Sequence, residues 1–336
     1  MNLKWNPELF TIRVSAGDSA AAQTGVPPRR PLVSTIAVAW YPADPVKLIG
    51  ELTGYLATAD ADTEGRTAGD DCNIFIVPHA GYAYSGLCAA YAYKRMRSRG
   101  FRRVILLAPS HRVWLDNRIM LPESDAVSTP LGTIGIDPAL VRALRTLSFT
   151  GMSDNVHRDE HSTQIQYPFL QTVLEEGFTI LPVIVGKLRQ DAASGLGALL
   201  LSLMTPETLL IVSSDFTHYG TRFGYAPFQS DFQNNVRLVD LEAYQHIQNH
   251  DAGAFHRFVE RNHCTICGSE PIRAMLTMNT PVFETTLFRY CNSASASGER
   301  DFVCYLACGI RVPVAETSYD LTDSDKTLLL DFARRA

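Results

Sequence analysis

Short apolar runs alternate with segments of helical pattern from Ile36 onward, and this alternation restricts the fold more than any other feature of the chain. The runs have strand length and are almost continuously hydrophobic, which is typical of strands covered on both faces. We predict these strands at Ile74–Val77, Val104–Ala108, Thr179–Val185 and Leu209–Val212. Helices are predicted at Pro45–Ala57, Gly86–Ser98, Pro138–Leu147, Thr163–Glu176 and Phe232–Gln248.

Alternating strands and helices indicate an α/β fold, here a single domain with a central mixed, largely parallel sheet flanked by helices. Near the end of the chain, Phe288–Tyr290 and Phe302–Ile310 have strand composition, and we expect them to close the sheet. Residues 1–31 show no sustained period and end in a Gly-Val-Pro-Pro-Arg-Arg-Pro segment. They are predicted to form an N-terminal arm.

The composition argues against two classes of partner. Thirty Lys and Arg against 35 Asp and Glu give a formal charge of -5, without the clustered positive charge of a nucleic-acid-binding protein. The apolar runs are far shorter than the ~20 residues of a membrane-spanning helix, and the N-terminal residues lack the apolar core of a signal peptide. We therefore expect a cytoplasmic protein that binds neither nucleic acid nor membrane. Seven scattered cysteines do not suggest a disulfide framework.

Histidines follow three of the predicted strands directly. His79 comes after the first strand, His111 after the second, and Asp215 and His218 after the fourth. Ligands of open α/β sheets bind beyond the carboxyl ends of the strands, so these polar segments are expected to converge. One such histidine is more often structural than functional. Three in equivalent positions favour a shared site, and imidazole is the commonest metal ligand in proteins.

A fourth polar segment contains Cys264 and Cys267. The spacing suggests a zinc knuckle or a redox pair, but the chain has no second such pair and no thioredoxin-like pattern around it. Cys267 precedes a glycine and a predicted helix, where backbone N–H groups and the helix dipole favour a thiolate ligand. A buried, inert cysteine is the alternative interpretation.

Carboxylates lie beside an imidazole in the segment Arg158–Ser162, which precedes a predicted helix. This segment is expected either to cap that helix or, if it faces the same cleft, to move protons through Glu160 or His161. Both interpretations remain open from the residues alone.

Six motifs occur in order between about Val33 and Val312: Trp40–Pro45, Pro78–Gly86, Pro109–His111, Asp159–Ser162, Ser213–Gly220 and Thr265–Gly268. They resemble those of Memo proteins, which are called AmmeMemoRadiSam system protein B in prokaryotes. The resemblance assigns residues 32–312 to a Memo domain.

The resemblance implies a fold similar to the catalytic subunit of class III non-haem iron extradiol dioxygenases, with one metal ion at the strand ends. The two histidine ligands and one cysteine ligand of Memo proteins carry over to His79, His111 and Cys267, while Asp215 and His218 match residues that line the same pocket. Cysteine replaces the carboxylate of the related dioxygenases and makes the site softer. Fe(II) or Cu is therefore favoured and Zn is also expected to fit.

The chain departs from the family pattern at Cys264, whose thiol is a neighbour available for oxidation with Cys267, and at both ends. Residues 313–336 form a C-terminal extension in which Thr322 is placed to cap a helix with an apolar face. This extension resembles the first helix of an AMMECR domain, so we expect the native chain to continue past Ala336. By family context, AMMECR-domain and radical-SAM proteins are the expected partners.

The leading hypothesis for function is a metal-dependent, dioxygenase-like redox enzyme of unknown substrate, with open metal positions for dioxygen or a chelating substrate. His218, with Asp215 nearby to orient it or hold its charge, is the predicted general acid or base. Tyr82, Tyr84 and Ser110 are predicted in the substrate pocket, although the tyrosines suit packing on the sheet as well. The alternatives are a peptide or small-ligand binding module without turnover, and a zinc hydrolase with Glu160 or His218 as base.

Overall fold

The computed structural model describes residues 31–62, 68–294 and 300–314, and all statements below concern these residues. A single mixed sheet runs through them, with strands in the order β1-β5-β6-β8-β3-β9-β2-β12-β10; β11 pairs with β12, and β4 pairs with β7 and β8. The strands are β1 (Pro31–Val33), β2 (Ile74–Val77), β3 (Arg103–Pro109), β4 (Ile119–Leu121), β5 (Ala126–Thr129), β6 (Gly132–Ile136), β7 (Thr150–Met152), β8 (Thr179–Val185), β9 (Thr208–Ser213), β10 (His218–Tyr219), β11 (Glu284–Asn292) and β12 (Phe302–Arg311).

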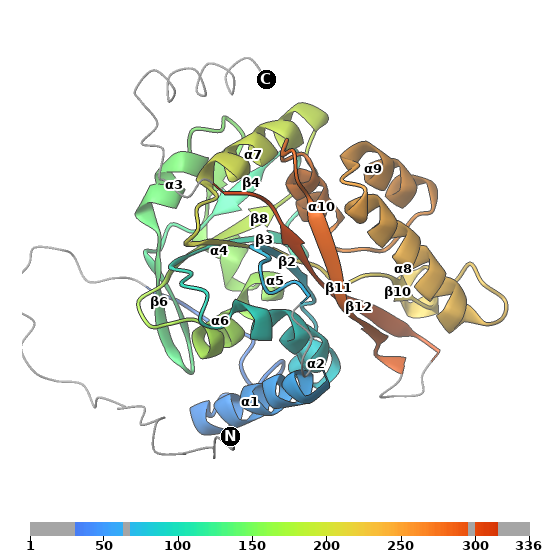
Figure 1. Cartoon of the computed structure of the whole chain (residues 1–336), viewed down its shortest axis with the longest axis horizontal. Helices are drawn as coiled ribbons and strands as arrows, with labels where there is room; N and C mark the ends of the chain where they lie inside the picture. The colour runs from blue at the N-terminus through green and yellow to red at the C-terminus, as the bar shows by residue number, and fades with distance from the viewer. Residues whose placement is uncertain (1–30, 63–67, 295–299, 315–336) are drawn as a thin grey trace, which may run out of the picture.

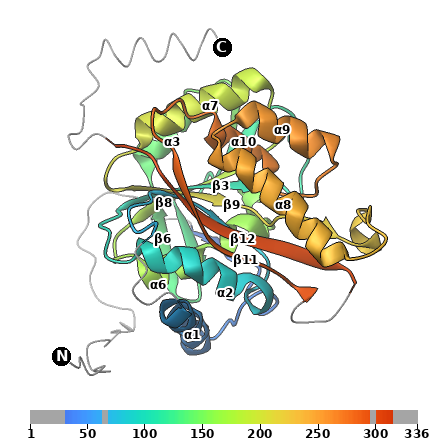
Figure 2. The ribbon, with the colours of Figure 1, turned by 45° about the vertical axis from the view of Figure 1, so that its right-hand side comes forward.

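Helices cover both faces of the sheet: α1, α2 and α6 lie on one side, and α3, α7, α8, α9 and α10 lie on the other (Figures 1 and 2). None of the described helices is long and apolar enough to cross a membrane. The helices are α1 (Pro45–Asp62), α2 (Tyr82–Tyr93), α3 (Pro138–Leu144), α4 (Asp154–Arg158), α5 (His161–Gln164), α6 (Tyr167–Val173), α7 (Gln190–Leu203), α8 (Phe232–Gln248), α9 (Ala252–Arg261) and α10 (Ser269–Leu276), with 3-10 turns η2 (Lys94–Met96) and η3 (Thr221–Phe223).

The centre of the sheet consists of five parallel strands, β6, β8, β3, β9 and β2. The side chains of β2 and β9 are buried along their whole length, as are those of β3 after its first residue. Burial on both faces explains why these segments are apolar at every position instead of alternating. The predicted α/β architecture and all four predicted core strands are confirmed.

Several predicted boundaries were wrong. The helix predicted from Gly86 begins at Tyr82, and its last turn tightens into η2. The helix predicted from Thr163 to Glu176 is instead two short helices, α5 and α6. Pro168 lies in the first turn of α6, where its missing N–H costs nothing, so it starts a new helix and does not continue the previous one. The N-terminal arm up to residue 30 and the extension from residue 315 lie outside the described residues.

A buried carboxylate joins α8 to the sheet. Asp240 Oδ1 accepts hydrogen bonds from the backbone N of Thr217 at 3.2 Å and from its Oγ1 at 2.6 Å, and Oδ2 accepts one from the Tyr290 hydroxyl at 2.8 Å. Burial raises the pKa of Asp240 to about 6, although the hydrogen bonds from Thr217 and Tyr290 oppose that rise. This carboxyl group therefore holds its proton in the folded protein at pH values where an exposed aspartate has lost it.

Asp240 is expected to make the protein less stable as the pH rises from about 3.8 to about 6. The protonated carboxyl group adds its full contribution to the free energy of unfolding below the pKa of the unfolded chain. That contribution is lost as the pH rises through the higher pKa of the folded protein. The difference between the two pKa values corresponds to about 3 kcal/mol. Asp240→Asn cannot ionise and keeps an acceptor for Thr217, so its advantage over the wild type should grow through this range. Urea unfolding at several pH values measures this; parallel stability curves would contradict it.

Candidate metal centre

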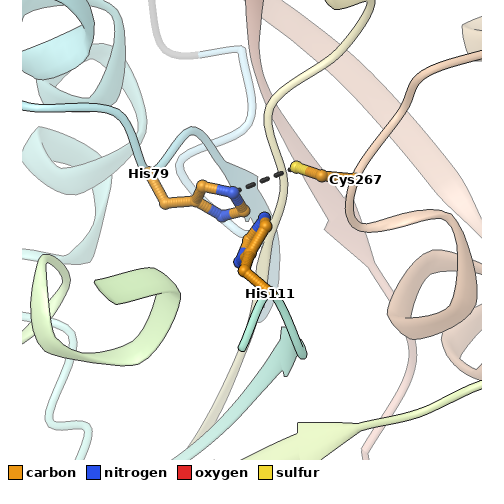
Figure 3. A group of neighbouring side chains, drawn as sticks. All are labelled: His79, His111 and Cys267. Atoms are coloured by element: carbon orange, nitrogen blue, oxygen red, sulfur yellow. Dashed lines mark hydrogen bonds between the residues drawn. The ribbon is translucent and has the colours of Figure 1, made fainter. Parts of the chain in front are cut away.

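Three adjacent parallel strands, β3, β9 and β2, end at the same edge of the sheet. His79 follows β2, His111 follows β3, and Asp215 follows β9, so the convergence expected from the sequence is confirmed. Cys267 enters from the loop before α10. Figure 3 shows its sulfur and the two imidazoles turned toward one another.

The ring of His79 is held in one tautomer by a chain of hydrogen bonds. Ser213 Oγ donates its proton to the Ser162 carbonyl at 2.7 Å, so it can only accept from His79 Nδ1, which lies 2.9 Å away. Gln166 Nε2 also donates to Ser213 Oγ, at 2.8 Å. Nδ1 of His79 therefore carries the proton, and Nε2 presents a lone pair toward Cys267.

Burial lowers the pKa of His79 well below its ordinary value, and the neighbouring His111, His161 and His218 lower it further. The ring is therefore neutral at physiological pH. A neutral imidazole with a free Nε2 is the form that binds a metal ion.

His111 is fixed by the buried carboxylate of Glu160. Glu160 Oε1 accepts a hydrogen bond from His111 Nδ1 at 2.8 Å, and Oε2 accepts one from the backbone N of His111 at 2.6 Å. Nδ1 of His111 therefore faces the carboxylate, and Nε2 is the ring nitrogen that can bind a metal ion, as in the carboxylate–histidine–metal arrangements of many metalloproteins. Burial raises the pKa of Glu160, but the hydrogen bonds and charge of His111 outweigh burial and bring that pKa down to about 2.

Cys267 lies where its sulfur can complete a ligand set. Its Sγ is 3.0 Å from His79 Nε2 and accepts a hydrogen bond from the backbone N of Asp215 at 3.3 Å. Burial and the charge of Asp215 raise the pKa of the Cys267 thiol well above its ordinary value. The predicted thiolate-favouring environment is therefore wrong for the metal-free chain, because the backbone donors are too weak to offset burial. A bound cation deprotonates a coordinating thiol directly.

The residues fit a metal ion. One ligand atom from each of His79, His111 and Cys267 lies within 4.8 Å of the others, so a single ion between them can contact all three after small side-chain adjustments. The 3.0 Å contact between sulfur and imidazole is that of an S–H···N hydrogen bond, whose proton a metal would replace. Two imidazoles and one thiolate form a donor set of intermediate softness, suited to Zn, Cu or Fe.

His218 is oriented by backbone carbonyls and not, as the sequence suggested, by Asp215. Its Nδ1 lies 3.0 Å from the carbonyl oxygens of both Phe216 and Thr265, which can only accept, so Nδ1 carries the proton. Nε2 is then the ring nitrogen that can contact a ligand in the cavity that His218 lines. Asp215 instead accepts a hydrogen bond from the backbone N of His79 at 2.7 Å and stabilises that strand end.

Of the two roles that the sequence left open for the segment containing Glu160 and His161, the structure shows the helix cap. The Glu160 carboxylate caps α5 by accepting from the backbone N of Ser162 at 3.1 Å, and it also orients His111. His161 stacks on Trp40, with ring centroids 4.4 Å apart, and lies equally close to His111. Burial lowers the pKa of His161 to about 4, with a further contribution from His111. His161 is therefore a neutral group beside the metal ligands.

A cavity of about 510 Å³ opens above the ligand set. Asp215 and His218 line this cavity as the resemblance implied, and of Tyr82, Tyr84 and Ser110 only Tyr84 does. Tyr82 is 3% exposed, and its hydroxyl donates to the Ile165 carbonyl at 2.7 Å. The Ser110 hydroxyl donates to the Val113 carbonyl at 2.6 Å and is absent from the cavity wall. The structure therefore places Tyr82 in the core and Ser110 outside the cavity.

Other residues of the site gave no clear signal in the sequence. Trp40, Arg222 and Tyr305 line the cavity, and Ser213 and Gln166 act on His79 only through hydrogen bonds. Trp40 and Ser213 lie in two of the six motifs, so the motifs could have identified them. The others lie on elements whose positions depend on the tertiary fold.

Glu160→Gln is expected to weaken metal binding by about 10–100-fold, the usual effect of removing a carboxylate that orients a histidine ligand. The amide is a weaker acceptor than the carboxylate and holds the His111 tautomer less firmly. Competition with a chromophoric chelator measures the affinity, and Glu175→Gln, on the surface, is the control. Unchanged affinity would show that Glu160 only caps α5.

Fold and site together define an α/β protein with a group of two histidines and one cysteine that could bind one metal ion at the carboxyl edge of its sheet. The family described as Memo-like protein matches residues 32–308. The chain belongs to the Memo family.

Several known proteins are about one third identical in sequence to this chain over most of its length. Protein MEMO1 of Rattus norvegicus is 34% identical over 272 residues, covering 78% of this chain and 89% of that protein. Protein MEMO1 of Homo sapiens is 33% identical over 277 residues, covering 79% of this chain and 91% of that protein. Protein memo-1 homolog of Caenorhabditis elegans is 34% identical over 247 residues, covering 71% and 69%.

Proposed function

We propose that this chain is a metal-dependent redox enzyme that binds one iron or copper ion through His79, His111 and Cys267 and acts, in a dioxygenase-like manner, on a small molecule or peptide in the adjoining cavity. The proposal rests on one observation: both imidazoles are fixed with Nδ1 protonated, so their Nε2 atoms and the Cys267 sulfur converge below that cavity.

Three protein ligands leave coordination positions open on the cavity side. A bound redox-active ion would supply Lewis-acid and electron-transfer chemistry at these positions. The chain itself supplies a base close by, because His218 lines the same cavity and its Nδ1 donates to backbone carbonyls, so Nε2 is the ring nitrogen that remains for a substrate. His218 can therefore accept a proton from a hydroxyl group of a bound substrate and return it later.

Glu160 is a poorer candidate for the base. Its two oxygens already accept four hydrogen bonds, two from His111 and two from Ser162. These bonds and the low pKa of the carboxyl group make it a positioning residue for His111. His161, neutral and stacked on Trp40, forms part of the cavity wall and contacts the substrate in this proposal.

Elemental analysis of the full chain, purified without a chelating tag, tests the proposal. We expect close to one iron or copper ion per chain, and dioxygen consumption by the reduced, metal-loaded protein that His218→Gln diminishes. Stoichiometric zinc alone would support the hydrolase instead. Failure to take up any of these metals at equimolar concentration would overturn the metal site and leave the cavity as a binding module.

A further inference from the structure

Two cysteines that the metal site does not use meet where α2 packs on β11. Cys88, on α2, is buried, and Cys291, on β11, is partly exposed. Cys291 and Arg289 are two residues apart on β11 and so share one face of the strand, and the Arg289 guanidinium lies over the Tyr91 ring of α2, one turn from Cys88. The sulfur of Cys88 also lies 4.0 Å from the carbonyl oxygen of Arg289, two residues before Cys291 on the same strand. The two sulfurs are therefore neighbours across a helix–strand contact, although 203 positions separate them in the sequence.

The surroundings of the two thiols differ in a way that separates their roles. Arg289 lies on the α2 side of β11, with its guanidinium over the ring of Tyr91 at 5.1 Å. The hydrogen bond from Cys88 lowers the pKa of Cys291; burial raises it, and the charge of Arg289 lowers it again, so the result is below the ordinary value. Burial raises the pKa of Cys88. Cys291 is thus the accessible, more acidic thiol, and Cys88 is its sheltered neighbour.

We propose that Cys88 and Cys291 are a reversible dithiol pair whose oxidation forms a disulfide between α2 and β11. With glutathione disulfide as oxidant, the Cys291 thiolate attacks one glutathione sulfur and releases the first glutathione thiolate. Cys88, on losing its proton to that thiolate, attacks the Cys291 sulfur and releases the second glutathione. Two protein thiols are oxidised, one glutathione disulfide is reduced to two glutathione molecules, and the exchange runs backwards in excess glutathione.

The disulfide would join two walls of the cavity above the metal ligands. α2 begins directly after Gly81, which lines this cavity, and Tyr84 on its first turn does so too. β11 leads directly to Ser293, another lining residue. Oxidation would therefore fix the spacing of these walls. The proposal does not depend on the metal, because no ligand of the metal site takes part in the exchange.

Two other cysteines provide a matched comparison within the same fold. Cys72 and Cys308 are both buried, and Cys72 lies against Gly309, whose Cβ position is on the face of β12 opposite to the Cys308 side chain. Burial raises the pKa of Cys72 to about 12, and burial likewise raises that of Cys308. Neither thiol is both exposed and acidic. These two buried, weakly acidic thiols should therefore stay reduced under mild oxidation.

The test equilibrates the metal-free full chain in buffers of increasing glutathione disulfide, alkylates the remaining thiols and maps the peptides by mass spectrometry. We expect a Cys88–Cys291 cross-link that excess glutathione reverses, with Cys72 and Cys308 still alkylated. In Cys88→Ser, Cys291 should be trapped as a mixed disulfide with glutathione, at a rate about tenfold above that of Cys72. In Cys291→Ser, Cys88 should stay reduced.

Absence of the cross-link across the whole range, or equal reactivity of Cys291 and Cys72, would overturn the proposal. So would a cross-link from Cys291 to any other cysteine. Cys88→Ala, which places no hydroxyl in the buried site, repeats the trapping experiment if Cys88→Ser folds poorly. Circular dichroism of each variant confirms that the comparison is between folded proteins. Metal loading is not needed for any arm, so this result and that of the elemental analysis are independent.

Discussion

Replacing His79 with alanine is expected to lower the affinity for the bound metal ion by about 10³-fold. Four-ligand structural zinc sites bind with roughly 10–16 kcal/mol, so each protein ligand contributes a few kcal/mol. His79 is the most constrained of the three ligands, since Ser213 fixes its tautomer and its Nε2 faces the Cys267 sulfur.

The variant keeps its fold in this prediction. Alanine removes the hydrogen bond to Ser213 and the contact with Cys267, which costs about 1–3 kcal/mol at a buried position. The large core of the sheet is not touched. Metal titration by calorimetry gives the affinity, and circular dichroism checks the fold. His256→Ala, on α9 outside the site, is the matched control; equal affinity in both variants would show that His79 is not a ligand.

The sequence predicted the strand ends of this site well, and the reason is local. Strands buried on both faces are apolar at every position, so the change to Pro78-His79 or Ser110-His111 marks where each strand leaves the core. Parallel strands place their carboxyl ends on one edge whatever their order. The convergence of His79, His111 and Asp215 could therefore be predicted without knowing that β9 lies between β2 and β3.

Cys267 was harder to assign from the residues alone. It follows no strand, and its loop reaches the site only because α10 packs behind the sheet. The spacing between Cys264 and Cys267 is compatible with a zinc knuckle, a redox pair or an inert thiol. Only the resemblance to the family identified Cys267 as a metal ligand. The pairing of Cys88 with Cys291 had no sequence signal at all, because it depends on how one helix lies on one strand.

The two tyrosines after Gly81 show how a small error in a helix boundary changes a prediction about function. A helix starting at Gly86 would leave Tyr82 and Tyr84 in a loop facing the ligand. The helix starts at Tyr82, so its 3.6-residue period turns Tyr82 into the core and leaves Tyr84 58% exposed at the cavity. Hydrogen-bond partners such as Ser213 escape sequence analysis for a similar reason: a polar residue at a strand end has many possible partners.

Gly268→Ala is expected to weaken metal binding by about 100-fold, although Gly268 is not itself a ligand. A Cβ on this residue would lie 2.3 Å from Ser214 Cβ and 2.8 Å from the Ser213 carbonyl oxygen. Its φ of -87° is accessible to any residue, so the constraint is contact and not backbone strain. Either the loop carrying Cys267 moves outward or the end of β9 moves, and Ser213 at that end holds His79. Both movements separate ligands of the same ion.

Overpacking of this kind also lowers the free energy of unfolding by about 1–3 kcal/mol. Gly195→Ala on α7 is the matched control, because nothing lies within 4 Å of its added Cβ. Alanine there should raise stability by up to about 1 kcal/mol through helix propensity and leave metal affinity unchanged. Chelator competition and urea unfolding on both variants separate the two effects. A Gly268→Ala protein that binds metal as tightly as Gly195→Ala would mean that the Cys267 loop can shift without withdrawing the sulfur, so its packing against β9 would not be what positions this ligand.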